Sequence, residues 1–348
     1  MHKGQGIETV SATILAQKAM KRDYIASTDR LQMTDKAELQ FTTGVTTRVY
    51  QPSEICIRQI GDRVGIPAKY LERMRAQAPE LLARNVNHWF TAQPEKRMIR
   101  TFENGTNTAR AFLSNSFRPL DNIDIASHVL PRLVDAGCEI ASTAITDSRL
   151  YIQAIIPRME ATIAKVGDVV NSGVVISNSE VGCGSLWIEH LVWTKKCTNG
   201  MIGQNVIRKN HVGRRKFDDV EEAREFFSDN TRQADDKAFW LKVQDLVKHA
   251  LSKEMFDSAI AKLNEAVKVE IESPSEVIEV MSERFAWQDQ EAEKVLNHFI
   301  RGGSATQYGL LNAVTRTAED IESYDRAIEF ERAGGEILLL KPSDFNNN

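Results

Sequence analysis

Apolar and polar residues alternate along several short segments in the first two-thirds of the chain. Between Arg149 and Ile156 every second residue is apolar, which predicts a β-strand with two different faces. Met98–Phe102 and Ala109–Phe112 are extended runs on either side of Asn104-Gly105, a dipeptide typical of hairpin turns. Asp121–Ala136 instead repeats its apolar residues at helical spacing. These patterns predict antiparallel hairpins mixed with helices.

The pattern changes after the middle of the chain. From Asp218 to about Ala333 the apolar spacing is helical nearly throughout, and Gly334-Gly335 is expected to end the last helix before a short strand at Ile337–Leu340. We therefore expect an α+β fold of mixed helices and antiparallel hairpins, followed by a mainly helical C-terminal part. The expected divisions are a polar N-terminal segment at 1–35, an α+β domain at 36–217 with a helical hairpin at 52–82, and helices at 218–348.

Residues Ile57–Met74 have the pattern of a helix-turn-helix. Gly61 stands where two helices would cross closely, Gly65 at the turn, and Pro67 at the start of the second helix. Ile66, Leu71 and Met74 are then expected to face inward.

This register places Lys69, Tyr70 and Arg73 on the outer side of the second helix, where a DNA-recognition helix carries its contacts. Any short helical hairpin with a glycine turn has the same pattern. We favour this structural interpretation, in which Tyr70 is buried and stabilises the fold.

The charge is divided unevenly along the 348 residues, although the net charge is only −4. Residues 1–217 hold 29 Lys+Arg against 20 Asp+Glu, and residues 218–348 hold 15 against 28. Such asymmetry indicates a polyanionic partner for the basic half, or attraction between the two halves within one chain or between subunits.

The most basic segment runs from Lys195 to Lys216 and contains no acidic residue. Its cations are Lys195, Lys196, Arg208, Lys209, Arg214, Arg215 and Lys216. Phosphates of a nucleic acid favour such an arrangement because each neutralised phosphate releases condensed counterions. A solvated loop, or a dock for the acidic helices, would have the same composition.

Two further groups extend this hypothesis. Trp187 and Trp193 share one face of the strand that enters the basic segment, where they could stack on bases or simply fill a core. Arg110 and Arg118 lie beside aromatic residues near the helix that starts at Asp121 and could contribute phosphate contacts. Asp121 or Asn122 could instead simply cap that helix.

Enzyme and metal motifs are absent from the sequence. There is no phosphate-binding GxxxxGK[ST], HExxH, GxSxG or GxGxxG pattern. Cys183, His190 and Cys197 recur at seven-residue intervals, but a metal site would need a fourth ligand, and no metal or cofactor is expected. With neither a secretory signal nor an apolar run long enough for a bilayer, we expect a cytoplasmic protein without membrane contact.

Four motifs together resemble the phage/plasmid-like protein family of unknown function, whose members occur on phages, prophages and conjugative plasmids. They are Arg110–Asn122, Ile176–Gly182, Cys197–Met201 and Gly309–Thr315. The resemblance spans about Val45 to Thr317 and implies a mobile-element protein, but it supplies no catalytic residues. Phage single-strand annealing proteins share a comparable plan at the level of architecture alone.

The sequence thus favours a non-catalytic protein of a mobile element that binds nucleic acid, DNA rather than RNA, in recombination or single-strand handling. One alternative is a protein-binding or virion-associated assembly protein that forms homo-oligomers through oppositely charged surfaces. Another is a nuclease or anti-restriction factor whose catalytic residues are dispersed along the chain.

Overall fold

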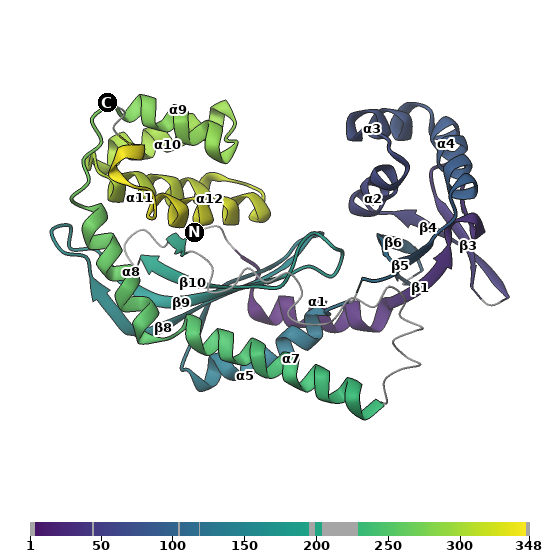
Figure 1. The fold of residues 1–348 in the computed structure, drawn as a ribbon, viewed down its shortest axis with the longest axis horizontal. Coiled ribbons are helices and arrows are strands. Elements are labelled where there is room, and N and C mark those ends of the chain that lie inside the picture. The colour runs from purple at the N-terminus through teal and green to yellow at the C-terminus, as the bar shows by residue number, and fades with distance from the viewer. Residues whose placement is uncertain are drawn as a thin grey trace.

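The structure is a computed structural model in which two lobes, each built on its own β-sheet, lie side by side (Figure 1). It describes residues 4–43, 45–103, 105–117, 119–194, 199–203 and 229–345. Within these ranges no helix is both long and apolar enough to cross a lipid bilayer.

The first lobe contains a six-stranded sheet with helices on one face (Figure 1). Its strands, in the spatial order β1-β5-β6-β4-β3-β2, are β1 (Lys21–Ser27), β2 (Leu31–Met33), β3 (Leu39–Thr43), β4 (Thr46–Pro52), β5 (Lys96–Phe102) and β6 (Thr108–Ser114). The β4–β6 pair is parallel and the other neighbours are antiparallel. The covering helices are α2 (Glu54–Val64), α3 (Ala68–Gln77) and α4 (Pro79–Ala92).

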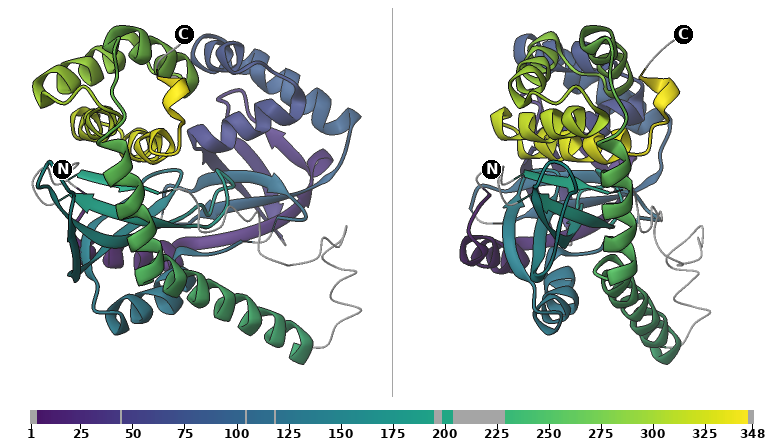
Figure 2. Two further views of the ribbon diagram at one scale, coloured as in Figure 1. Left: turned by 60° about the vertical axis from the view of Figure 1, so that its left-hand side comes forward. Right: turned by 90° about the vertical axis from the view of Figure 1, so that its left-hand side faces the viewer.

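The second lobe contains an antiparallel five-stranded sheet between two layers of helices (Figure 2). In the spatial order β11-β10-β9-β8-β7, its strands are β7 (Glu139–Ile145), β8 (Leu150–Thr162), β9 (Val169–Asn178), β10 (Trp187–Thr194) and β11 (Asn199–Ile202). One face packs against α1 (Ile7–Met20), α5 (Asn122–Asp135) and α7 (Asp229–Ala250). The opposite side carries α8 (Lys253–Ala266), α9 (Pro274–Phe285), α10 (Asp289–Gly302), α11 (Gln307–Thr317) and α12 (Tyr324–Ile337).

Burial on both faces follows from the residues of β8. Leu150, Ile152 and Ala154 pack with α1, α5 and α7, whereas Tyr151 packs toward α12. Successive side chains of a strand point to opposite faces, so each set needs its own layer of helices. The acidic C-terminal helices therefore complete the core of this sheet.

The structure confirms the expected α+β class and several of its parts. The helical hairpin expected at 52–82 corresponds to α2 and α3, but the helical stretch is longer, because α4 begins at Pro79 and continues to Ala92. The strands β5 and β6 form the expected antiparallel pair. Helix α5 contains Pro131 and is followed by Gly137, which takes the left-handed conformation (φ 71°) expected of a residue that ends a helix.

Two expected features differ from the structure. The segment at 1–35 is not separate, because β1 pairs along its whole length with β5. Gly334-Gly335 does not end the last helix: α12 continues to Ile337, and Ile337–Leu340 is not a strand. The glycines instead allow α12 to approach β11, since a Cβ on Gly335 would lie 1.8 Å from the Ile202 carbonyl oxygen.

Gly335→Ala is expected to lower the free energy of unfolding by about 1–3 kcal/mol, because the added methyl group overpacks the contact between α12 and β11. Gly302→Ala is the matched control, since a Cβ at this helical glycine meets nothing within 4 Å. Urea denaturation measures both effects. Equal stability of the two variants would contradict the packing argument.

Candidate functional site

The helices α2 and α3 form the helix-turn-helix that the sequence predicts. Ser53 caps α2, its hydroxyl oxygen accepting a hydrogen bond from the backbone N–H of Cys56, and Gly65 makes the turn with φ 72°. A Cβ on Gly61 would lie 2.7 Å from Leu71 Cδ2, so glycine permits this close crossing of the helices without a shift of Leu71. Ile66, Leu71 and Met74 are buried, as expected.

The outer side of α3 carries Lys69, Tyr70 and Arg73, which are all exposed. Tyr70 is 47% exposed, so our prediction that it is buried is wrong. Arg73 lies 3.4 Å from the side-chain oxygen of Gln77, a neutral group. Among the described residues neither Lys69 nor Arg73 forms an ion pair. The helix therefore presents two uncompensated positive charges around an aromatic ring.

The main basic segment lies outside the described residues. This applies to Lys195, Lys196, Arg208, Lys209, Arg214, Arg215 and Lys216, and also to Arg118. Their proposed phosphate contacts stay predictions.

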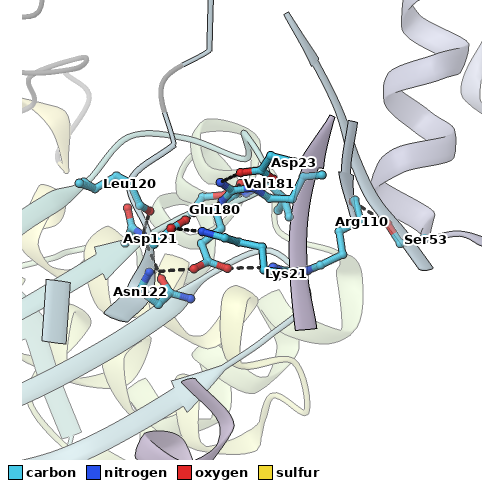
Figure 3. A network of polar contacts seen from close by, with 12 residues as sticks. Lys21, Asp23, Ser53, Arg110, Leu120, Asp121, Asn122, Glu180 and Val181 are labelled. Atoms are coloured by element: carbon cyan, nitrogen blue, oxygen red, sulfur yellow. Dashed lines mark hydrogen bonds and ion pairs between the residues drawn. The ribbon is translucent and has the colours of Figure 1, made fainter. Parts of the chain in front are cut away.

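Arg110 is not available for phosphate contacts. Its side chain is buried, its Nη1 lies 2.8 Å from Glu180 Oε2, and its guanidinium lies over the Phe102 ring. Glu180 Oε1 accepts a hydrogen bond from the Asn122 backbone N–H, the first of α5 (Figure 3). A carboxylate is favourable at this position because a helix N-terminus carries partial positive charge.

Arg100 is the centre of the same network. It is completely buried, and its guanidinium makes two hydrogen bonds with Asp23, of 2.9 and 2.8 Å. Its Nη1 donates to the Glu180 carbonyl oxygen (3.1 Å) and lies 3.0 Å from Asp121 Oδ1, close enough for an ion pair but not aligned as a hydrogen bond. Burial alone would lower the pKa of Arg100, but Asp23, Asp121 and Glu180 outweigh it and raise the pKa.

Asp121 therefore has a role different from the expected helix cap. Its side chain makes no capping hydrogen bond to α5 but pairs with Lys21 (Figure 3). It also pairs with Arg100. Because Lys21 and Arg100 belong to β1 and β5, this acid joins the second lobe to the sheet of the first.

The two tryptophans of β10 share a face, as expected, but have different environments. Trp193 is buried with Tyr151, Leu191 and Ile202, so it belongs to the core and cannot stack on bases. The ring of Trp187 is partly exposed, and guanidinium carbons lie 3.9 Å (Arg332) and 5.3 Å (Arg149) from its centre. The sequence pattern does not predict these contacts, because Arg149 and Arg332 are both distant from Trp187 in the chain.

The seven-residue series of cysteine and histidine does not form a metal site among its described members. His190 is buried, its Nε2 lies 3.3 Å from the Ser172 hydroxyl, and burial lowers its pKa to about 4. Cys183 is exposed and Cys197 lies outside the described residues. Within the described ranges no cluster of three His, Cys, Asp or Glu side chains could hold a metal ion.

A buried carboxyl group on α12 faces the middle of the second sheet. Glu331 is 9% exposed, and its Oε2 accepts a hydrogen bond from Gln153 Nε2 at 2.6 Å. Burial raises the pKa of Glu331 to about 8. The side chain is therefore mostly protonated at neutral pH.

No protein family model, curated protein or solved structure matches this chain. The resemblance to the phage/plasmid-like family stays a prediction from the sequence.

Arg100→Met is expected to lower the free energy of unfolding by about 3–5 kcal/mol, because it leaves Asp23 and Asp121 without their buried partner. Arg58→Met is the control, since the exposed pair Arg58–Glu72 should contribute less than about 1 kcal/mol. Urea denaturation measures both variants. A loss at Arg100 no larger than at Arg58 would show that the network does not hold the lobes.

Glu331 is expected to make the protein less stable as the pH rises. Its folded pKa (about 8) exceeds the unfolded value of 4.5, so the folded state holds the extra proton between these values. The contribution of Glu331 to the free energy of unfolding is therefore fully present below the unfolded pKa and is lost through this window, by about 1 kcal/mol from pH 7 to 8.

Glu331→Gln should remove this loss and keep the bond to Gln153. The exposed Glu336→Gln on the same helix serves as the control. Thermal unfolding at pH 7 and 8 measures the difference, and this range lies above the titration of His190. An identical pH dependence in wild type and Glu331→Gln would contradict the assignment.

Proposed function

We propose that this protein is a non-catalytic nucleic-acid-binding protein and that α3 contacts DNA. The observation that supports this most directly is the outer side of α3, where Lys69, Tyr70 and Arg73 are exposed while the inner side is buried. A recognition helix needs this division, because its buried side fixes its position and its exposed side meets the groove.

The charges on α3 strengthen the proposal. Most arginines of α2 to α4 are already paired: Arg58 with Glu72, Arg63 with Glu95, and Arg75 with Glu54. Paired cations are partly neutralised before a phosphate arrives, whereas Lys69 and Arg73 are not. The basic segment Lys195–Lys216 would add phosphate contacts, and a role in a mobile element rests on the sequence resemblance.

Replacing both cations (Lys69→Ala with Arg73→Ala) is expected to weaken DNA binding at least tenfold, since each lost charged hydrogen bond costs about 1.5 kcal/mol or more. Two lost phosphate contacts should also reduce the log–log salt slope by about 1.8 with duplex DNA or about 1.4 with a single strand. Fluorescence anisotropy with a labelled duplex and its separated strand, at several salt concentrations, measures both quantities.

The matched control removes two exposed cations from the other lobe (Lys262→Ala with Arg301→Ala) and changes the net charge equally. Its salt slope should stay that of the wild type. Unchanged binding by the α3 variant would exclude α3 as the interface. No binding of either DNA by the wild-type protein would exclude the proposed function and favour an assembly role.

A further inference from the structure

A second cluster of cations lies where the sheet of the second lobe meets the first lobe. The end of β9, the start of β10 and the residue before β8 bring together Ser177, Trp187 and Arg149, and Arg332 of α12 reaches the same place. Arg149 Nη1 and Arg332 Nη2 lie 3.3 and 3.5 Å from the Ser177 hydroxyl oxygen. Both guanidiniums also contact the Trp187 ring.

An exposed glycine-rich loop lies beside these arginines. Arg149 donates to the carbonyl oxygens of Cys183 (2.8 Å) and Ser185 (3.2 Å) and so fixes the loop between β9 and β10. Gly182 and Gly184 have φ values of 80° and 127°, and a Cβ on Gly184 would lie 1.8 Å from Arg149 Nη2. The positive φ of Gly184 favours glycine, and any larger residue there would displace the Arg149 guanidinium.

The same loop touches the helix-turn-helix. Gln59 of α2 donates to the Val181 carbonyl oxygen at 2.8 Å, and a Cβ on Gly182 would lie 2.6 Å from Leu113 of β6. The loop and α2 are thus neighbours, although they are more than a hundred residues apart in the chain.

The two arginines differ in how their charge is balanced. Arg332 pairs with the buried carboxylate of Glu189 at 2.7 Å. Arg149 bonds to one hydroxyl and two carbonyl oxygens, and among the described residues no carboxylate lies within ion-pair distance of it. Its desolvation by burial lowers the pKa of the Arg149 guanidinium.

Arg149 also keeps donors for a ligand. A guanidinium has five N–H donors, and the three contacts above engage three of them. Nε–H and one Nη2–H have no acceptor among the residues that the structure describes. A half-buried cation with spare donors beside an exposed loop matches the requirements of a phosphate oxygen.

We propose that Arg149, beside the exposed loop at Gly182–Gly184, binds a phosphate of the nucleic acid that α3 contacts. The choice of ligand rests on the proposed function, whereas the anion site rests on the geometry of Arg149. The Trp187 ring contacts the Arg149 guanidinium, and the nearby charge of Arg332 adds to the positive potential that an anion would meet.

The test compares Arg149→Gln, Arg149→Lys and the control Arg158→Gln, which neutralises another arginine of the β8 region. Binding of the labelled duplex and its single strand is measured against salt. Arg149→Gln should weaken binding about tenfold and reduce the salt slope by about 0.9 for the duplex or about 0.7 for the strand. Arg149→Lys should keep the slope because it keeps the charge, and Arg158→Gln should match the wild type.

A second measurement uses Trp187 as a reporter and does not require a variant of Arg149. Inorganic pyrophosphate is added to the wild-type protein and to Trp187→Phe. A saturable change in tryptophan fluorescence in the wild type, absent from Trp187→Phe, supports the anion site. This titration decides the question if Arg149→Gln fails to fold, as judged by circular dichroism.

The outcomes separate this inference from the proposed function. If folded Arg149→Gln has the wild-type salt slope while the α3 variant loses affinity, the inference is overturned and the function stands. The absence of a pyrophosphate response specific to Trp187 also overturns the inference. A pyrophosphate response without any DNA binding overturns the proposed function and leaves only a site for a different phosphate compound.

Discussion

The burial of Arg100 is the constraint on which the arrangement of the two lobes depends. A completely buried guanidinium is stable only when its charge and its donors are satisfied, because the desolvation of an ion costs several kcal/mol. Asp23 comes from β1, Asp121 from the start of α5 and the Glu180 carbonyl from the loop after β9. Three segments must therefore meet at one point. The sheet of the first lobe is fixed to the second lobe by charge as well as by apolar packing.

The four sequence motifs contribute residues to two contact regions, one between the lobes and one between layers of the second lobe. Arg110 and Asn122 from the first motif meet Glu180 from the second, beside Arg100. Met201 from the third motif packs with Leu310 and Leu311 from the fourth, where β11 lies against α11. The residues named from these motifs therefore have structural roles: they hold the two lobes, or the layers of the second lobe, together. Helix α3 and Arg149, which are proposed to bind nucleic acid, lie outside all four motifs, whereas Gly182 of the loop beside Arg149 belongs to the second motif.

Local structure could be predicted from the sequence where one residue type permits one conformation. Gly61, Gly65 and Pro67 define the helix-turn-helix within a few turns of helix, and the structure agrees. The pairings of Arg110 with Glu180 and of Arg100 with Asp23 join residues 70 and 77 positions apart, and nothing in a single sequence specifies them. From the sequence alone, Arg110 is therefore expected to be available for phosphate contacts, which the structure contradicts. The prediction that Gly334-Gly335 ends the last helix was wrong for the same reason. The carbonyl oxygen that requires a glycine at this point belongs to Ile202, which is distant in the sequence.

The uneven charge of the chain has a spatial consequence for binding. Residues 21–114, which form the first lobe, hold 15 Lys+Arg against 10 Asp+Glu, whereas residues 251–345 hold 10 against 19. A polyanion is repelled by the second group and attracted by the first, which contains α3. Since α8 to α12 cover the far side of the second sheet, a nucleic acid bound as proposed would be repelled from that side and attracted to α3. Arg149 lies between α2 and α12, so a phosphate held there would lie between the basic first lobe and the acidic helices.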